Sequence, residues 1–313
     1  TEWIPLYALF MVKIVREPSL KNGFLAGLFA TLALLSEMIF GVFLFFLTAI
    51  YFLFAGRERI LNWGFAKRLG AFLLTFLLTY LPVGYPVIKG LMGADYALKG
   101  WGHSEELLVD LFGFTTPTSL HPLLGGGWSR ELTMVREGTA RFTDVNTVYL
   151  GWVAILLAII AAIRYWPKLK SWAVSAAVFA LFSMGPLLHI NGRSTFDLDG
   201  LPVDIPLPFI ILHYLPVIKA NRVPNRFSVV LLLALSVLVG FALYAILRRI
   251  KGKPLLLAGT AALGLILSFE HLSTPLPLTD ARVPGFYYAL AAEPGDFAIL
   301  QFPLGWRNSF GVL

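Results

Sequence analysis

The residues best suited to chemistry in this chain are one carboxylate and one small basic cluster, far apart in the sequence. Glu37 is the only charged residue between positions 23 and 55, and Lys219, Arg222 and Arg226 follow a short apolar segment. A carboxylate can act as a general base or a metal ligand, and guanidinium groups offer forked donors that suit phosphate. Two simpler interpretations stay open: Glu37 as a hydrogen-bonded turn residue, and the basic residues as headgroup anchors or ion-pair partners of nearby carboxylates.

A second acidic group has weaker potential. Asp197 and Asp199 flank one leucine and could hold a divalent metal near a phosphate, but they also have the form of an ordinary turn before Gly200, which we favour. His103 and His121 lack the spacing of a metal site. The chain contains no cysteine, which excludes disulfides and thiolate metal sites. We therefore expect no certain cofactor, with a divalent metal at the two aspartates as the alternative.

The elements that must position these residues are membrane helices. Hydrophobic residues make up 58% of the 313 residues and charged residues 14%, with a mean hydropathy of +0.76, whereas soluble domains carry roughly a quarter charged residues. Apolar segments close to the length of a membrane span, ~17 to 25 residues, recur at 69–88, 147–163, 171–188, 227–247 and 254–269. We expect helices, because a backbone in lipid must satisfy its own hydrogen bonds. The fold class is therefore an all-α integral membrane bundle.

The apolar segment around Glu37 is too long for one crossing. Residues 23–55 would make a helix of about 50 Å, against a hydrocarbon core of roughly 30 Å. We predict a hairpin of two short helices, 23–35 and 38–55, that turns near Ser36 and Glu37, with Gly23 and Gly27 allowing close packing of the first arm. With a further span at Trp3–Val15, the chain has about eight predicted crossings. Glu37 would lie in a wet depression lined by protein, because a carboxylate in lipid is costly.

The distribution of basic residues predicts the orientation. Four connections, at 13–21, 57–68, 164–170 and 248–253, hold fourteen basic residues and two acidic ones. By the positive-inside rule these connections are cytoplasmic, and the net charge of +7 reflects orientation better than nucleic-acid binding. Glu37 and the basic cluster around Pro224 are then external. We expect the protein to lie in a bacterial cytoplasmic membrane, in contact with its lipids.

The predicted domains follow from this topology. Residues 1–270 form the transmembrane helical domain, with long external loops at 89–146 and 189–225. In the first loop, Glu105, Glu106 and Asp110 are expected on a solvated helix face. Residues 271–313 begin an external α/β or β domain in which 297–304 (FAILQFPL) reads as a strand. Because the chain starts at Thr1 and one strand is not stable alone, we expect both ends to be missing.

Several segments together resemble a known family. They are EWIPLY at 2–7, SLHPLLGG at 119–126, VYLGWVAILLA at 148–158, the segment from PLPF at 206–209 to RVPNRF at 222–227, and AILQFPLGWRNSFG at 298–311. These segments are similar to bacterial multi-spanning proteins of the GT-C glycosyltransferase superfamily. The resemblance covers most of the chain, and its motifs are architectural more than catalytic.

The resemblance implies an inverting transfer of a sugar from a polyprenyl-phosphate carrier to an acceptor on the outer face of the membrane. It implies a principal acidic residue before Thr1, a second acidic position at Glu37, and carrier-phosphate contacts at Arg222 and Arg226, with Lys219 beside them. Two alternatives stay open: a transporter or flippase of a lipid-linked sugar, and a non-catalytic membrane anchor for an external domain. The sugar, the acceptor and the oligomeric state do not follow from the sequence.

Overall fold

The computed structural model is mostly helical and describes residues 2–17, 19–93, 104, 107–118, 120–126, 147–214, 223–274, 283 and 285–298. Its longer helices are α1 (Trp3–Arg16), α2 (Leu20–Ser36), α3 (Phe40–Ala55), α5 (Trp63–Gly93), α7 (Trp152–Arg164), α8 (Trp166–Ser183), α10 (Ser228–Leu247) and α11 (Lys253–Glu270). The short elements are α4 (Arg57–Ile60), α9 (Phe209–His213), α12 (Gly285–Ala291), the 3₁₀ turns η1 (Leu111–Phe114) and η3 (Pro224–Phe227), and the strands β1 (Thr195–Leu198) and β2 (Leu201–Asp204). A helix therefore lies at each of the eight predicted ranges.

Three helical segments in the described part of the chain are long and apolar enough to cross a membrane. They are Trp63–Val87, Pro224–Leu247 and Lys253–Glu270, while α2, α3 and α7 are apolar but shorter. These segments agree with a membrane protein. Eight crossings stay a prediction, because the shorter helices span a bilayer only with help from their neighbours or from local thinning.

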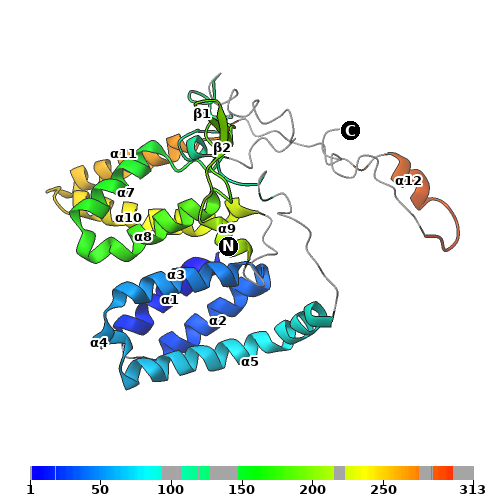
Figure 1. The fold of residues 1–313 in the computed structure, drawn as a ribbon, viewed down its shortest axis with the longest axis horizontal. Helices are drawn as coiled ribbons and strands as arrows, with labels where there is room; N and C mark the ends of the chain where they lie inside the picture. Colours follow the sequence, from blue (N-terminus) through cyan, green and yellow to red (C-terminus); the bar gives the residue numbers. More distant parts are fainter. Residues whose placement is uncertain are drawn as a thin grey trace.

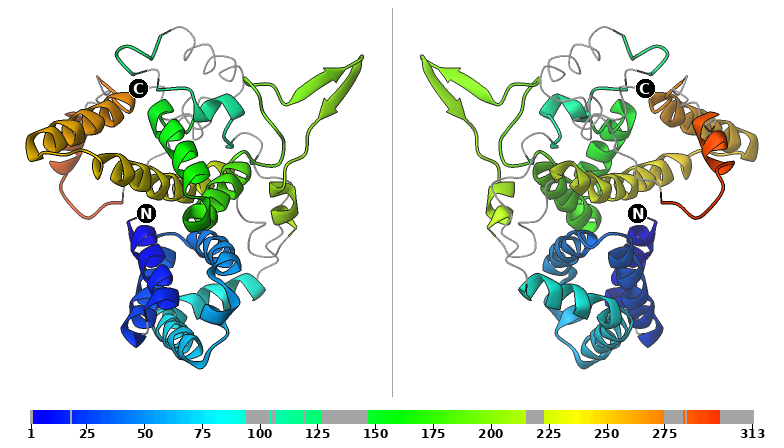
Figure 2. Two further views of the ribbon diagram at one scale, coloured as in Figure 1. Left: turned by 90° about the vertical axis from the view of Figure 1, so that its left-hand side faces the viewer. Right: turned by 90° about the vertical axis from the view of Figure 1, so that its right-hand side faces the viewer.

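The longer helices form two groups that meet along α3. The first group comprises α1, α2, α3 and α5, and the second comprises α7, α8, α10 and α11 (Figure 1). The two groups meet where α3 packs against α8. The antiparallel strands β1 and β2 form a hairpin that projects away from the helices (Figure 2).

Small residues allow the close packing predicted for α2, and the structure shows that its partner is α5. A Cβ atom added at Gly23 would lie 2.3 Å from the carbonyl oxygen of Arg68, and one added at Gly27 would lie 2.6 Å from that of Phe72. The Oγ1 atoms of Thr31 and Thr79 are 2.7 Å apart across the same contact. Such close approach increases dispersion contact between helices, which drives helix association where lipid removes the hydrophobic difference.

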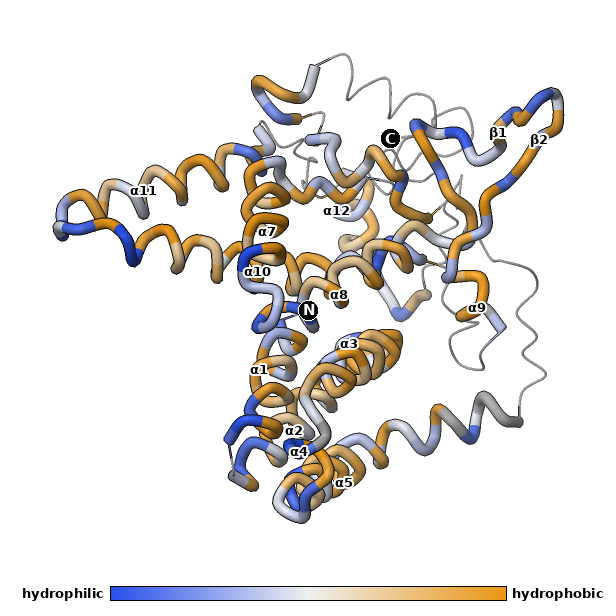
Figure 3. Tube along the Cα trace, turned by 60° about the vertical axis from the view of Figure 1, so that its left-hand side comes forward, coloured by the Kyte–Doolittle hydropathy of each residue, from blue (hydrophilic) through white to orange (hydrophobic). Residues whose placement is uncertain are grey.

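Two helices expose apolar surface along most of their length. On α5, exposed leucines recur through the middle of the helix, and α11 exposes Leu257 and Leu265 at 64% and 71%. Figure 3 shows hydrophobic residues along α5, α10 and α11, with hydrophilic residues gathered in the connection between α10 and α11. A water-exposed apolar surface of this extent is unusual for a soluble monomer, whereas lipid covers it without cost.

The connections fall at two opposite ends of the helices. The ends of α1, α3, α7 and α10 and the starts of α2, α5, α8 and α11 lie together, toward the left in Figure 1, at what we call the basic end. The turn between α2 and α3 and the start of α10 lie at the other, which we call the hairpin end. This arrangement is the one that alternating crossings require.

Two helices differ in extent from the predicted apolar segments. Helix α5 continues to Gly93 through Pro82 and Pro86, although its candidate membrane span ends at Val87, so its last turns belong to the loop predicted from 89. Helix α8 begins at Trp166, because helix geometry tolerates the lysines that hydropathy excluded, and it ends at Ser183, where Gly185 adopts a φ of +75°. The strand predicted at 297–304 lies mostly outside the described residues.

Candidate functional site

The two residues singled out at the hairpin end lie together. The carboxylate of Glu37 forms an ion pair and hydrogen bond with the guanidinium of Arg226. The contact joins the tip of the α2–α3 hairpin to the start of α10, and hence the first group of helices to the second. From the sequence, Glu37 and Arg226 were expected on one side of the membrane, but their contact was not predicted.

The turn that carries Glu37 forms between Ser36 and Phe40, as predicted. Glu37 has extended backbone angles (φ −162°, ψ 124°) that end α2, and its backbone N–H donates to the carbonyl of Ala33 at 3.1 Å. Its own carbonyl accepts from the N–H of Phe40 at 3.0 Å. Because the backbone N–H and carbonyl of Glu37 are both paired within the turn, its side chain is not needed to cap α2 and can reach Arg226.

Arg226 is positioned by η3, the 3₁₀ turn that leads into α10. Pro224 opens this turn, where its fixed φ suits a helix start and its missing N–H is not needed. The N–H of Asn225 donates to the carbonyl of Leu107 at 3.1 Å, which holds the turn to the 107–118 segment. The neighbouring Phe227 is fully buried. These contacts orient Arg226 toward the hairpin tip.

An aromatic cluster lies directly beneath the ion pair. The ring of Phe227 lies 4.4 Å from that of Phe43 on α3, 5.9 Å and 5.3 Å from those of Phe179 and Phe182 on α8, and 6.1 Å from that of Phe209 on α9 (centroid to centroid). Aromatic pairs at such distances add about 0.5 to 1.5 kcal/mol beyond the area they bury. We infer that the cluster fixes the separation of α3 and α10, and with it the distance between Glu37 and Arg226.

The ion pair remains open to solvent. The side chains of Glu37 and Arg226 are 35% and 46% exposed. An exposed pair of this kind contributes little to stability, typically below about 1 kcal/mol. A guanidinium in this position can exchange its carboxylate partner for a phosphate group at small cost, since both offer oxygens that match its forked donors.

The rest of the predicted basic cluster lies outside the described residues. Lys219 and Arg222 belong to the range 215–222, so their positions relative to Glu37 stay predictions. The range follows α9, whose Phe209 is buried in the aromatic cluster.

Asp197 and Asp199 form a turn, as favoured from the sequence. They belong to the exposed hairpin of β1 and β2, where Asp199 and Gly200 have positive φ angles of 53° and 84°. The N–H of Gly200 donates to a carboxylate oxygen of Asp197 at 2.6 Å. Among the described residues no group of histidine and acidic side chains is placed to hold a metal.

Asp110 contradicts its prediction as a solvated residue. It is fully buried, and its carboxylate accepts N–H groups from Phe112 (2.9 Å), Asn191 (3.1 Å) and Gly192 (2.9 Å). Asp110 thus ties η1 to the turn that precedes β1. Sequence spacing could not reveal this role because the partners are about eighty residues away. Glu105 and Glu106 lie outside the described residues.

Two further buried polar residues support the same end of the second group. Both carboxylate oxygens of Glu270, at the end of α11, accept the N–H of Val153 in the first turn of α7 (2.9 and 3.1 Å). The Nε2 atom of His121 lies 2.8 Å from the carbonyl of Phe269, while its Nδ1 accepts N–H groups from Leu123 and Leu124. The histidine is therefore the neutral Nε2–H tautomer, with a structural role.

Comparisons with protein families, with curated proteins and with solved structures find no match to this chain. Its function has to be inferred from its own residues and geometry.

Proposed function

We propose that this chain is part of a membrane glycosyltransferase that moves a sugar from a polyprenyl-phosphate carrier to an acceptor on the outer face of the membrane. One observation carries the proposal: Arg226 and Glu37 lie together at the hairpin end, opposite the basic connections. A cation suited to phosphate and a carboxylate suited to a hydroxyl proton are what such a transfer requires in one place. The sequence resemblance to GT-C glycosyltransferases points in the same direction.

The proposed chemistry gives each residue a role. The oxygen of an acceptor hydroxyl attacks the anomeric carbon of the sugar from the side opposite the carrier, and inverts it. The bond between that carbon and the carrier phosphate oxygen breaks, and the phosphate leaves with the electron pair. A carboxylate accepts the hydroxyl proton, and Arg226 stabilises the negative charge on the leaving phosphate.

The ion pair defines the resting state of the proposed site. With no carrier bound, Glu37 occupies the guanidinium of Arg226. Arrival of the carrier phosphate would replace this contact and release the carboxylate to accept a proton. Because both side chains are more than one-third exposed, this exchange leaves neither charge buried and unpaired.

A non-catalytic anchor is the second candidate, and the ion pair itself favours it. In this alternative the pair only joins the tip of the α2–α3 hairpin to the start of α10, and Arg226 does not exchange Glu37 for a phosphate. This alternative predicts that Arg226 contributes nothing to phosphate binding.

Carrier binding separates the two candidates. We would measure the affinity of the purified full chain for a polyprenyl phosphate, and compare Arg226→Gln with Arg193→Gln, an exposed arginine beside β1. We expect Arg226→Gln to weaken binding about 10-fold, since hydrogen bonds to charged groups contribute about 1.5 to 3 kcal/mol and partial exposure reduces this. Arg193→Gln should leave it unchanged. Equal affinities for the two variants would assign Arg226 to anchoring.

A further inference from the structure

A cavity of about 750 Å³ lies between the two groups of helices at the basic end, remote from Glu37 and Arg226. Its walls come from the ends of α1 and α3, from α4, from the first turns of α8 and from the middle of α10. Helix α3 runs from Phe40, near Glu37, to Ala55, which lines the cavity. The ion pair and the cavity are therefore separated by the length of this helix, about 24 Å.

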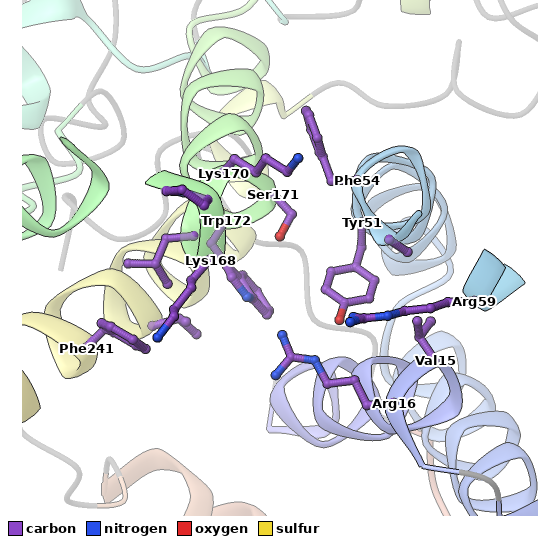
Figure 4. Close-up of a pocket in the computed structure, with 14 residues that line it drawn as sticks. Val15, Arg16, Tyr51, Phe54, Arg59, Lys168, Lys170, Ser171, Trp172 and Phe241 are labelled. Atoms are coloured by element: carbon purple, nitrogen blue, oxygen red, sulfur yellow. The ribbon is translucent and has the colours of Figure 1, made fainter. Parts of the chain in front are cut away.

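Four basic side chains line this cavity: Arg16, Arg59, Lys168 and Lys170. In Figure 4 the guanidinium groups of Arg16 and Arg59 turn from different helices toward the same space, and the hydroxyls of Tyr51 and Ser171 face it. Among the described residues that line the cavity, none is acidic. Hydroxyl and guanidinium donors around an open space match the oxygens of a phosphate group.

The nearest acidic residues do not neutralise this charge. Glu17 lies 3.7 Å from Lys13 and accepts a hydrogen bond from Asn22 at 3.3 Å, and Glu58, on α4, is exposed. Within the described part of the chain, none of the four basic side chains has a carboxylate partner. Like charges gathered without a counter-charge favour an anionic occupant.

Aromatic side chains also line the cavity. Tyr51 on α3 and Trp172 on α8 lie 6.5 Å apart (ring centroids), and Lys170 lies 5.4 Å from the ring centroid of Phe54. Tyrosine and tryptophan are enriched where a membrane meets water, at the level of lipid headgroups. The cavity therefore combines aromatic residues typical of the headgroup level with apolar residues of α3 and α10, Phe54 and Phe241, that suit the adjoining acyl chains.

We propose that this cavity binds the headgroup of an anionic phospholipid of the leaflet at the basic end. Arg16 and Arg59 contact the phosphate, Lys168 and Lys170 flank it, and the lipid fills the seam between the two groups of helices. This inference goes beyond the proposed function and does not depend on it, because it uses other residues at the opposite end of the helices.

The test is lipid binding by the purified full chain, measured by native mass spectrometry with phosphatidylglycerol, cardiolipin and phosphatidylcholine. The unaltered chain should retain the two anionic lipids in preference to phosphatidylcholine. The variant Arg16→Gln/Arg59→Gln should lower that preference about 10-fold, since each basic residue near an anionic lipid surface raises the affinity roughly three- to fivefold. The matched control Arg249→Gln/Lys251→Gln removes the same charge from exposed positions that do not line the cavity.

Three results would overturn the proposal. One is no preference for anionic lipid in the unaltered chain, and a second is an equal loss in the cavity variant and in the control. The third is displacement of the lipid by millimolar inorganic phosphate, which would identify a soluble anion as the ligand. Size-exclusion profiles of both variants show whether each is folded. Because Arg16 and Arg59 are exposed, we expect their replacement to leave the fold intact.

Discussion

The carboxylate of Glu37 pairs with the guanidinium of Arg226, which lies 189 residues further along the chain. The pair closes the hairpin end of the seam between the two groups of helices. Below it, Phe43 and Phe227 continue the same seam, and Tyr51 and Trp172 extend it to the basic end. Contacts along α3 therefore hold the two groups together at three levels.

The strength of the ion pair can be measured by a double-mutant cycle. We expect Glu37→Gln and Arg226→Gln to show a coupling free energy of about 0.3 to 1 kcal/mol in the unfolding of the detergent-solubilised chain, because both side chains are partly exposed. The charge-exchanged variant Glu37→Arg/Arg226→Glu should regain most of the coupling. Independent effects of the two single substitutions would mean that the pair does not form.

Phe227 should matter more for stability than either charged residue. Replacing this fully buried ring by alanine leaves a cavity among Phe43, Phe179 and Phe182, and we expect a loss of about 3 to 5 kcal/mol. Phe45→Ala is the matched control, since this ring is 66% exposed, and it should cost under about 1 kcal/mol. Similar losses in thermal unfolding for the two variants would argue against the aromatic cluster.

Gly27 tests the packing of α2 on α5. A methyl group there would meet the Phe72 carbonyl at 2.6 Å and Thr75 Cβ at 2.9 Å, so Gly27→Ala should destabilise the chain by about 1 to 3 kcal/mol. At Gly70, on α5, nothing lies within 4 Å, and Gly70→Ala should be neutral or stabilise the helix by up to about 1 kcal/mol. The idea fails if the melting temperatures of both variants change in the same direction.

Tyr149, just before α7, should make the folded chain less stable at alkaline pH. Burial, and secondarily the negative charge of Glu270, raise the pKa of this tyrosine above its usual value of 10. The folded state therefore favours the neutral phenol, so its contribution is complete below pH 10 and declines as the pH rises above 10 toward the higher folded pKa.

The variant Tyr149→Phe removes the phenol hydroxyl and therefore its titration. Tyr149→Phe should change stability by less than about 1 kcal/mol at pH 8, where the phenol is neutral in both the folded and the unfolded state. Between pH 10 and pH 11, unfolding of the variant should depend less on pH than unfolding of the unaltered chain. The exposed Tyr244→Phe is the control. An unchanged slope in Tyr149→Phe would show that the phenol does not titrate differently in the folded state.

Much of the helical organisation could be predicted because hydrophobicity and charge act locally. The 33 apolar residues at 23–55 exceed one span, and their only charged residue marked the turn between α2 and α3. Asp199 and Gly200 revealed their turn through residue types that tolerate positive φ.

Contacts between distant segments could not be predicted in this way. The pairing of Glu37 with Arg226 and the contact of Glu270 with the start of α7 depend on how helices far apart in sequence pack. Asp110 was expected to be solvated because acidic residues in loops usually are, whereas three backbone N–H groups from two turns offset the cost of burying it. The cavity at the basic end likewise uses residues from five helices, none of which indicates a pocket alone.

The proposed site requires Glu37 and Arg226 to face the outer compartment. The absence of cysteine allows single cysteines to be placed at Met38, beside Glu37 and 46% exposed, and at Lys251, in the exposed connection of the basic end. Ser171, which is buried, would report accessibility and not topology. In intact cells treated with a membrane-impermeant maleimide, we expect labelling of Met38→Cys at once and of Lys251→Cys only after the cells are permeabilised. Labelling of Lys251→Cys in intact cells, with Met38→Cys protected until permeabilisation, would show that Glu37 and Arg226 face the cytoplasm.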